Sequence, residues 1–404
     1  MTLFIGRQPI LDRFQKTYGY ELLFRDSLQN VFTGHDVDQA SMKVIDTSVG
    51  QMGLQKITGG GKAFINFTRQ LLLEDYGNLL PRDQVVIEVL ETITPDAEIV
   101  ASCRRLKDGG YTLALDDFQY APAYEPLLDM VDIIKVDLSV SDERERLHFA
   151  ETYLPRKIKL LAERVETLAD FEQTREMGYA FFQGYFFSKP VVLTGERLPE
   201  SKLGRIRLLV AINRPDFDFG AAEEIIKHDP TLSMKLFRYI NSAFFGIRQE
   251  IKSIRQALTL LGEKNIRKWC TILVISSLVD DKPPELLKQA IVRARFCELL
   301  ASETGQGGND QELFMTGMFS LLDTMLNQAM PDLLADLPLS AMVKETLLGE
   351  ATSFQEIFRL VTAFEVGDWE RVESLANSLR VNSEILPELQ QQSFVWADAL
   401  AAEQ

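Results

Sequence analysis

Short apolar runs and helix-length segments alternate through the first 190 residues of the chain. Several of these runs are apolar throughout, as expected of parallel strands that are buried on both faces. Repeated strand–helix units of this kind predict either a closed barrel or a doubly wound sheet. The eight candidate strands favour the barrel, and they are residues 3–10, 18–24, 63–67, 85–89, 112–115, 133–136, 159–162 and 180–187. Candidate helices between them include residues 36–49, 95–107, 141–153 and 168–177.

The pattern changes after Pro190. Residues 191–196 indicate a connector, and from about Lys202 onward apolar residues recur at the helical period. Ser253 and Asp229, each placed before an apolar run, predict helix starts. We therefore expect two domains, an α/β TIM-like (β/α)8 barrel over residues 1–195 and an all-α domain over residues 196–404. The chain of 404 residues is long enough to bury both cores.

Polar side chains stand at the ends of most of the candidate strands. A single acid after an apolar strand is ordinarily a solvated loop residue, but here successive strands share the feature. The carboxyl ends of the strands of a TIM-type barrel converge on one mouth, so we expect these groups to face one another. They are Glu21, Asn66, Glu88, Asp116, Asp117, Lys135, Glu163 and Gln183.

Clustered carboxylates repel one another unless a cation lies between them. The chain has only three histidines, so a metal site built on several imidazoles is almost excluded; they are His35, His148 and His228. Oxygen-rich sites suit Mg²⁺ or Mn²⁺, and two such ions about 3.5–4 Å apart can hydrolyse a phosphate ester. Lys135 would orient or deprotonate the attacking water. The alternative is that Lys135 pairs with a barrel carboxylate for stability alone.

Seven motifs, read in order, resemble those of the EAL domain family: GYELLFR, FINFT, VIEVLET, LALDDF, DIIKVD, LLAERVET and FFQGYFFSKP. EAL domains are TIM-like barrels that hydrolyse cyclic di-GMP to linear pGpG with Mg²⁺ or Mn²⁺, and the resemblance covers about residues 1–190. The resemblance implies a role for each matching residue. The roles are metal ligand for Glu21, Asn66, Glu88, Asp116 and Asp117, catalysis for Lys135 and Glu163, substrate binding for Arg25 and Gln183, and loop support for Glu91.

The signature reads Glu21-Leu22-Leu23, with leucine where the EAL family has alanine, a conservative change, and the chain departs from the EAL pattern in two further places. The family sequence DDFGTGYSSL becomes DDFQYAPAY from Asp116 onward, so both glycines are lost, and glycine permits backbone shapes that other residues resist. Arg164 replaces the usual glycine of AEGVET. In the family the loop after the aspartate pair helps to place the second metal and couples to barrel dimerisation. Turnover and formation of a homodimer therefore depend on how this loop folds here.

The second half resembles the HDOD domain, an all-α module related to HD phosphohydrolases, most clearly over residues 200–280. The matching segments are LSMKL, NSAFFG, IRQA and LLG. The adjacent pair His228 and Asp229 is the residue pair that names the HD superfamily, but it stands before Pro230, where Asp229 would cap a helix. No histidine follows His228. The HDOD half is therefore expected to be a helical scaffold, since an HD phosphohydrolase would need metal in this half.

As a whole the chain resembles bacterial EAL–HDOD signalling proteins of the YuxH-like group. The resemblance implies a cyclic di-GMP phosphodiesterase whose HDOD half passes the state of the barrel to an unidentified protein partner. The alternative is a catalytically impaired EAL domain that acts as a nucleotide sensor or as an interaction scaffold.

Charge and cysteine content narrow the partners and the compartment. The 43 basic and 59 acidic residues give a net charge of −16, which disfavours nucleic-acid polymers but not a small dianionic nucleotide held through metals. The three cysteines lack CxxC spacing and indicate reduced thiols. With no signal peptide and no run of about 18 apolar residues, we expect a cytoplasmic protein without a membrane segment.

Overall fold

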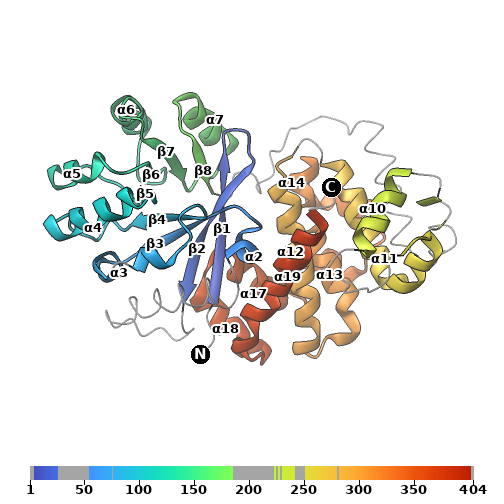
Figure 1. The fold of residues 1–404 in the computed structure, drawn as a ribbon. Coiled ribbons are helices and arrows are strands. Elements are labelled where there is room, and N and C mark those ends of the chain that lie inside the picture. The colour runs from blue at the N-terminus through green and yellow to red at the C-terminus, as the bar shows by residue number, and fades with distance from the viewer. Residues whose placement is uncertain are drawn as a thin grey trace. The chain divides into compact units, whose positions relative to one another are not determined.

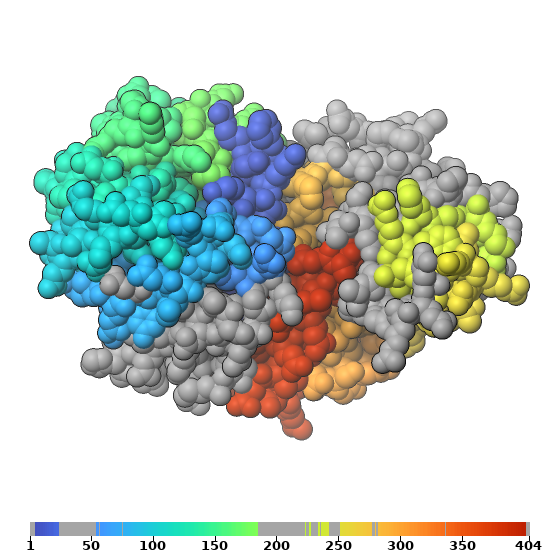
Figure 2. Space-filling model, in the orientation of Figure 1, coloured from blue at the N-terminus to red at the C-terminus, as the bar shows by residue number. Residues whose placement is uncertain are grey.

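The computed structural model describes residues 4–25, 54–74, 76–184, 223, 226–227, 230–241, 251–279 and 282–401. The chain divides into two compact units. Unit 1 comprises residues 1–189, 362–377 and 382–387, and unit 2 comprises residues 190–361, 378–381 and 388–404. The expected domain boundary at 195, the expected helix at 36–49, and both His35 and His228 lie outside the described residues. Figure 1 shows the elements of each unit as ribbons, and Figure 2 shows the same residues with their side chains.

Unit 1 contains a closed barrel in which the strands follow chain order around the ring, which confirms the TIM-like fold (Figure 1). β1 is antiparallel to both of its neighbours, β2 and β8, and the remaining neighbours are parallel. The strands are β1 (Phe4–Asp12), β2 (Thr17–Arg25), β3 (Lys62–Phe67), β4 (Val85–Val89), β5 (Thr112–Leu115), β6 (Ile133–Asp137), β7 (Lys159–Glu163) and β8 (Phe181–Gln183).

The reversed direction of β1 follows from the tight turn that joins it to β2. A parallel pair needs a crossover of a dozen or more residues, whereas this turn lies between Asp12 and Thr17. The Asp12 carboxylate organises the turn, because its Oδ1 accepts hydrogen bonds from the backbone N–H groups of Phe14 (2.8 Å) and Lys16 (2.9 Å).

Side-chain caps start the helices that follow several strands. Asp96 accepts hydrogen bonds from the backbone N–H groups of Glu98 and Ile99, and Asp142 and Thr167 each begin a capping box. These caps fix the direction in which the chain leaves the barrel mouth. The helices of this part are α2 (Leu54–Thr58), α3 (Arg69–Leu73), η2 (Tyr76–Leu79), α4 (Ala97–Asp108), η3 (Pro122–Tyr124), α5 (Glu125–Leu128), α6 (Glu143–Tyr153) and α7 (Leu168–Glu176).

The barrel interior is filled by a layer of buried apolar side chains, to which seven of the eight strands contribute one residue each. Such a layer is typical of a TIM barrel, whose interior is a packed core and not a pore. The members are Ile10, Phe64, Val86, Ala114, Ile133, Leu161 and Phe181. Any polar group on the inner face must therefore lie above or below this layer.

In the described part of the chain after residue 184, every regular element is a helix, as predicted. Ser253 caps α11 by accepting a hydrogen bond from Gln256 N, which confirms the helix start expected there. No helix among the described residues is long and apolar enough to cross a membrane. The helices are α10 (Pro230–Ile240), α11 (Ile254–Leu278), α12 (Pro284–Glu303), η6 (Gly307–Asn309), α13 (Asp310–Phe319), α14 (Leu322–Leu326), α15 (Met330–Asp336), α16 (Ala341–Leu347), α17 (Gln355–Val366), α18 (Trp369–Leu379), η7 (Ser383–Ile385) and α19 (Leu386–Ala401).

Candidate functional site

A polar layer lies directly above the apolar layer of the barrel. Side chains two positions apart on a strand point to the same face, so a strand that gives a residue to the core gives its next inward side chain to the mouth. On five strands this pairing joins Phe64 with Asn66, Val86 with Glu88, Ala114 with Asp116, Ile133 with Lys135, and Leu161 with Glu163. Phe181 and Gln183 complete the series on β8.

Lys135 is the centre of this layer. Its side chain is 1% exposed, and its Nζ lies near four carboxylates, three on β2, β4 and β7 and one directly after β5. The distances are 2.7 Å to Asp116 Oδ1, 2.9 Å to Glu88 Oε1, 3.0 Å to Glu163 Oε1 and 3.4 Å to Glu21 Oε2. The structure therefore brings together the lysine and four of the acids that were predicted from the strand ends.

Two amide side chains complete the surroundings of Glu21. Gln183 Nε2 donates a hydrogen bond to Glu21 Oε2 (2.7 Å), and Asn66 Nδ2 donates one to Glu21 Oε1 (3.2 Å). Gln183 Nε2 also donates to Gln8 Oε1 (2.9 Å). Burial alone would raise the pKa of Glu21, but the charge of Lys135 and these two amide donors outweigh burial and lower it.

The other acids of the layer have pKa values shifted upward. Burial, together with repulsion from Glu21 and Asp116, raises the pKa of Glu88 well above its usual range despite Lys135. Burial raises the pKa of Glu163 to about 8, with further repulsion from Asp116 and Glu21. For Lys135, the surrounding carboxylates outweigh burial and raise the pKa. Burial and mutual repulsion therefore favour the protonated form of these acids, and the single charge of Lys135 does not reverse this.

Several buried oxygen atoms around Lys135 lack a hydrogen-bond donor. They are Asn66 Oδ1, Glu88 Oε2, Glu163 Oε2 and Gln183 Oε1. An unsatisfied buried acceptor costs about 1–3 kcal/mol, and a bound cation would satisfy several of them together. All are carboxylate or amide oxygens, which are the ligands that Mg²⁺ and Mn²⁺ prefer. The residues present therefore fit a hard divalent cation.

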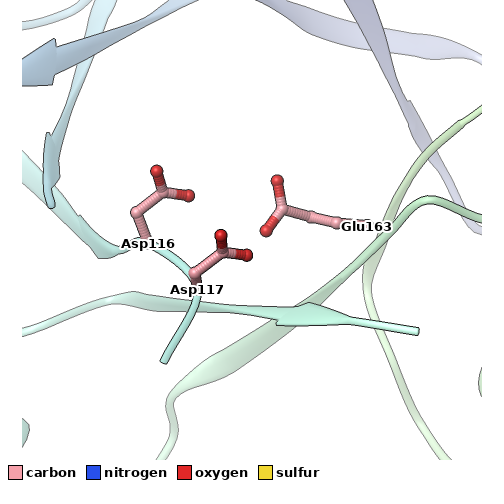
Figure 3. A group of neighbouring side chains, drawn as sticks. All are labelled: Asp116, Asp117 and Glu163. Atoms are coloured by element: carbon pink, nitrogen blue, oxygen red, sulfur yellow. The ribbon is translucent and has the colours of Figure 1, made fainter. Parts of the chain in front are cut away.

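A second group of oxygens lies at the outer edge of the same mouth. Asp116, Asp117 and Glu163 each offer one carboxylate oxygen, and these atoms lie within 4.8 Å of one another. Figure 3 shows the two aspartates, which directly follow β5, facing Glu163 from β7. Asp117 is exposed and has a φ of 40°, in the left-handed region that a residue other than glycine seldom adopts. The backbone turns sharply here and directs both aspartates toward the mouth.

The loop after Asp117 is held by aromatic packing. The Phe118 ring is buried and lies edge-on to the rings of Tyr124 (5.4 Å) and Tyr153 (5.7 Å). Tyr124 Oη also donates a hydrogen bond to the backbone carbonyl of Glu91 (3.1 Å). The Glu91 side chain is exposed, so the loop contact that the structure describes for this residue is made by its backbone. These contacts occupy the place where the EAL pattern has a glycine-rich loop.

Arg164 is directed to the neighbouring strand end. Its Nε lies 3.3 Å from Asp137 Oδ2, and its Nη1 donates a hydrogen bond to Ser139 Oγ (3.3 Å). Its φ of 52° is left-handed, which explains why glycine suits this position. Arg25 ends β2, and its side chain lies outside what the structure describes.

Gln8 is the member of the site that strand-end reasoning missed. It pairs with Glu21 across the β1–β2 ladder and accepts the hydrogen bond from Gln183. Because β1 runs against the other strands, Gln8 lies inside the strand and not at its carboxyl end. The short β1–β2 connection was the signal that would have placed it.

Comparisons with known proteins identify the families that the two halves of the chain resemble. The EAL domain model matches residues 42–190 and the HDOD domain model matches residues 198–360. The uncharacterised protein YuxH of Bacillus subtilis strain 168 is 34% identical over 387 residues, covering 94% of each chain. The cyclic di-GMP phosphodiesterase CdgJ of Vibrio cholerae is 36% identical over 375 residues, covering 92% of this chain and 87% of CdgJ. A crystal structure of an EAL domain protein from Listeria monocytogenes EGD-e matches with a TM-score of 0.39 and 23% identity, over 50% of this chain and 92% of that chain.

The fold and the site define a β/α barrel whose mouth holds carboxylates and amides around one lysine, followed by a helical region. The chain belongs to the family of proteins that join an EAL domain to an HDOD domain. The match to the EAL model begins after β2, so the place of Glu21 in the site rests on its contacts with Lys135, Asn66 and Gln183.

Proposed function

We propose that the barrel binds cyclic di-GMP through Mg²⁺ or Mn²⁺ and hydrolyses one of its phosphodiester bonds to give pGpG. The observation that carries the proposal is the convergence of two buried and two half-buried carboxylates and one lysine on a single mouth, next to oxygen atoms without donors. The name of the relative CdgJ, a cyclic di-GMP phosphodiesterase, supports this choice of substrate.

In this proposal the protein holds the cations with oxygen ligands from neighbouring strands. Glu21, Asn66, Glu88 and Asp116 would hold the inner ion, and Asp117 would hold the outer ion together with Asp116, with the Glu163 carboxylate beside them. When bound, such ions polarise a phosphodiester and lower the pKa of a bound water, which makes hydroxide available near neutral pH.

The remaining groups act on the substrate and on protons. The Lys135 ammonium offsets the negative charge that develops on the phosphoryl oxygens and orients the attacking water. Without metal, burial raises the pKa of Glu163 to about 8, and bound cations would favour its ionised form, which suits a general base. Gln183 presents its Oε1, which lacks a donor, to the substrate side of the mouth, and Arg25 contacts the anionic nucleotide.

The test is formation of pGpG from cyclic di-GMP with Mn²⁺ and with Mg²⁺. We expect turnover by the natural chain and at least a 100-fold loss in Glu21→Ala, because this substitution removes both an inner ligand and the acceptor of the Asn66 and Gln183 amides. Glu172→Ala, which changes an exposed acid on α7, is the matched control and is expected to retain activity. No product above the level of Glu21→Ala, with cyclic di-GMP still bound, would contradict the phosphodiesterase.

That contrary result would favour the second candidate function, a nucleotide sensor or interaction scaffold without turnover. The observation behind it is the replacement of both loop glycines after Asp117, together with the left-handed backbone that Asp117 itself adopts. The two functions share binding and differ in product, so binding and pGpG formation are measured on the same samples.

For the helical half we propose an interaction module that reports the state of the barrel to a protein partner. We propose that the halves divide near residue 195, although residues 362–377 and 382–387 group with unit 1. The match to the HDOD model supports this role. An HD phosphohydrolase is not proposed. Among the described residues, the group able to hold a metal with histidine, cysteine or acidic ligands is in the barrel.

A further inference from the structure

Lys135 occupies the position of a bound cation. An ammonium group has three N–H donors, yet four carboxylates from β2, β4, β7 and the end of β5 surround its Nζ at 2.7 to 3.4 Å. Ion pairing in proteins ordinarily joins one cation to one or two acids. Here a single ammonium lies among carboxylates in the way that a metal ion lies among its ligands.

These carboxylates are largely the same groups that fit a divalent cation. Glu21, Glu88 and Asp116 contact Lys135 Nζ, and they are also the acids that would hold the inner ion. Metal–oxygen distances for Mg²⁺ are about 2.0–2.1 Å, shorter than any of the distances to Nζ. The acids cannot close around a metal at that distance while the ammonium remains at their centre. Arg164 pairs with Asp137, so it does not take over the role of Lys135.

We infer that Lys135 is the resident cation of the metal-free mouth, and that a divalent ion binds only by displacing it from part of its carboxylates. Lys135 thereby holds the acids together before metal arrives and weakens metal binding by competition and charge repulsion. On binding, the ammonium is pushed toward Glu163 and the substrate side of the mouth, where the proposed reaction needs it. The inference rests on the metal-binding part of the proposed function and does not depend on turnover.

The test compares Mn²⁺ binding to the natural chain and to Lys135→Met, followed by the electron paramagnetic resonance signal of free Mn²⁺. Thermal unfolding is measured in parallel with EDTA and with Mn²⁺. Methionine retains the length of the side chain and removes its charge. We expect the Mn²⁺ dissociation constant to fall at least tenfold in Lys135→Met. We also expect a lower unfolding temperature in EDTA, so that the rise on adding Mn²⁺ is larger than in the natural chain.

Two variants control for charge. Lys16→Met makes the same change of charge at the exposed β1–β2 turn, at the amino-terminal end of β2, and is expected to leave Mn²⁺ binding unchanged. Lys135→Arg retains the positive charge and is expected not to bind Mn²⁺ more tightly. If Lys135→Met yields no folded protein, Lys135→Gln, which is uncharged and retains hydrogen-bond donors, serves in its place.

The outcomes separate this inference from the proposed function. Equal or weaker Mn²⁺ binding by Lys135→Met would overturn the inference and make Lys135 a supporter of the metal site. If Lys135→Met bound Mn²⁺ and the natural chain did not, the result would support the inference in its strongest form. Binding by neither protein would overturn the metal site itself and the inference with it. Loss of pGpG formation with tighter Mn²⁺ binding supports both the inference and a catalytic lysine.

Discussion

Two glutamates of the barrel mouth show how position decides the behaviour of one side-chain type. Glu21 accepts hydrogen bonds from two amides and lies near Lys135, and its pKa is lowered in spite of burial. Glu163 is similarly buried and also contacts Lys135, but its Oε2 has no donor and its pKa is raised to about 8. Neighbouring acids whose pKa values are pushed apart commonly divide into a fixed anion and a proton carrier.

The raised pKa of Glu163 gives a pH dependence with a definite sign. Between the usual glutamate pKa near 4.5 and about 8, the folded protein holds a proton that the unfolded chain has lost. The metal-free protein therefore loses stability as the pH rises through this range, and the contribution of Glu163 levels off above about 8. Cation binding requires the ionised form, so Mn²⁺ affinity rises over the same range. Thermal unfolding in EDTA between pH 6 and 9 measures how stability changes with pH. Mn²⁺ titration over the same range measures how Mn²⁺ affinity changes with pH.

Glu163→Gln isolates the contribution of Glu163 to the pH dependence, because glutamine has nearly the same shape as glutamate and does not titrate. We expect stability and Mn²⁺ affinity to depend less steeply on pH in this variant. Glu176→Gln, which changes an exposed acid at the end of α7, is expected to retain both pH dependences. An unchanged pH dependence in Glu163→Gln would assign the titration to another acid, with Glu88 and Asp116 the next candidates because their pKa values are also raised.

The loop between β5 and α5 shows how an element can keep its position after losing its glycines. Phe118 packs into the aromatic group beneath the loop, and its backbone N–H donates to Lys135 O (3.2 Å). Tyr124 joins the far end of the loop to the β4–α4 connection through the Glu91 carbonyl. The loop is thus attached at Phe118 and at Tyr124, and Asp117 directly precedes the first attachment.

Tyr124→Phe tests this attachment because it retains the ring that packs on Phe118 and removes only the hydroxyl. We expect a stability loss of about 0.5–1.5 kcal/mol from the hydrogen bond. We also expect faster amide exchange over residues 117–124 and several-fold weaker binding of the outer Mn²⁺, since Asp117 is then less constrained. Hydrogen exchange and Mn²⁺ titration measure these effects.

Tyr120→Phe removes a hydroxyl from the same loop at a side chain that is 59% exposed. It is the matched control, and it is expected to change neither amide exchange nor metal binding. Equal behaviour of the two variants would mean that packing of Phe118 alone positions the loop.

Sequence patterns predict the parts of this barrel that depend on periodicity. The inward positions of Glu88, Lys135 and Glu163 follow from the spacing of two that relates them to buried residues on the same strands. The direction of β1 and the role of Gln8 depend on a turn, and strand spacing alone does not determine them. The aromatic attachment of the β5–α5 loop depends on contacts between residues far apart in the chain, such as Tyr124 with Glu91, which no local pattern contains.

At the scale of the whole molecule, two tryptophans on the carboxyl-terminal helices belong to different units. Trp369 belongs to unit 1, where its ring meets Phe364 edge-on (5.1 Å) and lies beside Gly6 of β1. Trp396 belongs to unit 2, where it is 4% exposed and meets Phe314 edge-on (5.9 Å). The carboxyl-terminal segment therefore contributes to both cores, although the HDOD model matches only as far as residue 360.

This division predicts that the two tryptophans stabilise separate unfolding transitions. Mn²⁺ binds the barrel mouth in our proposal, so by mass action it raises the transition of unit 1 and identifies it. Trp396→Ala removes a buried ring at a cost of about 3–5 kcal/mol and is expected to lower the Mn²⁺-insensitive transition by about 10 °C. Trp369→Ala removes a half-buried ring and is expected to lower the Mn²⁺-sensitive transition by a smaller amount. Differential scanning calorimetry with EDTA and with Mn²⁺ resolves the transitions and their shifts.

If both substitutions lowered one and the same transition, the units would unfold together. The helical half would then be energetically coupled to the metal state of the barrel, and two separately folding domains divided near residue 195 would be the wrong description.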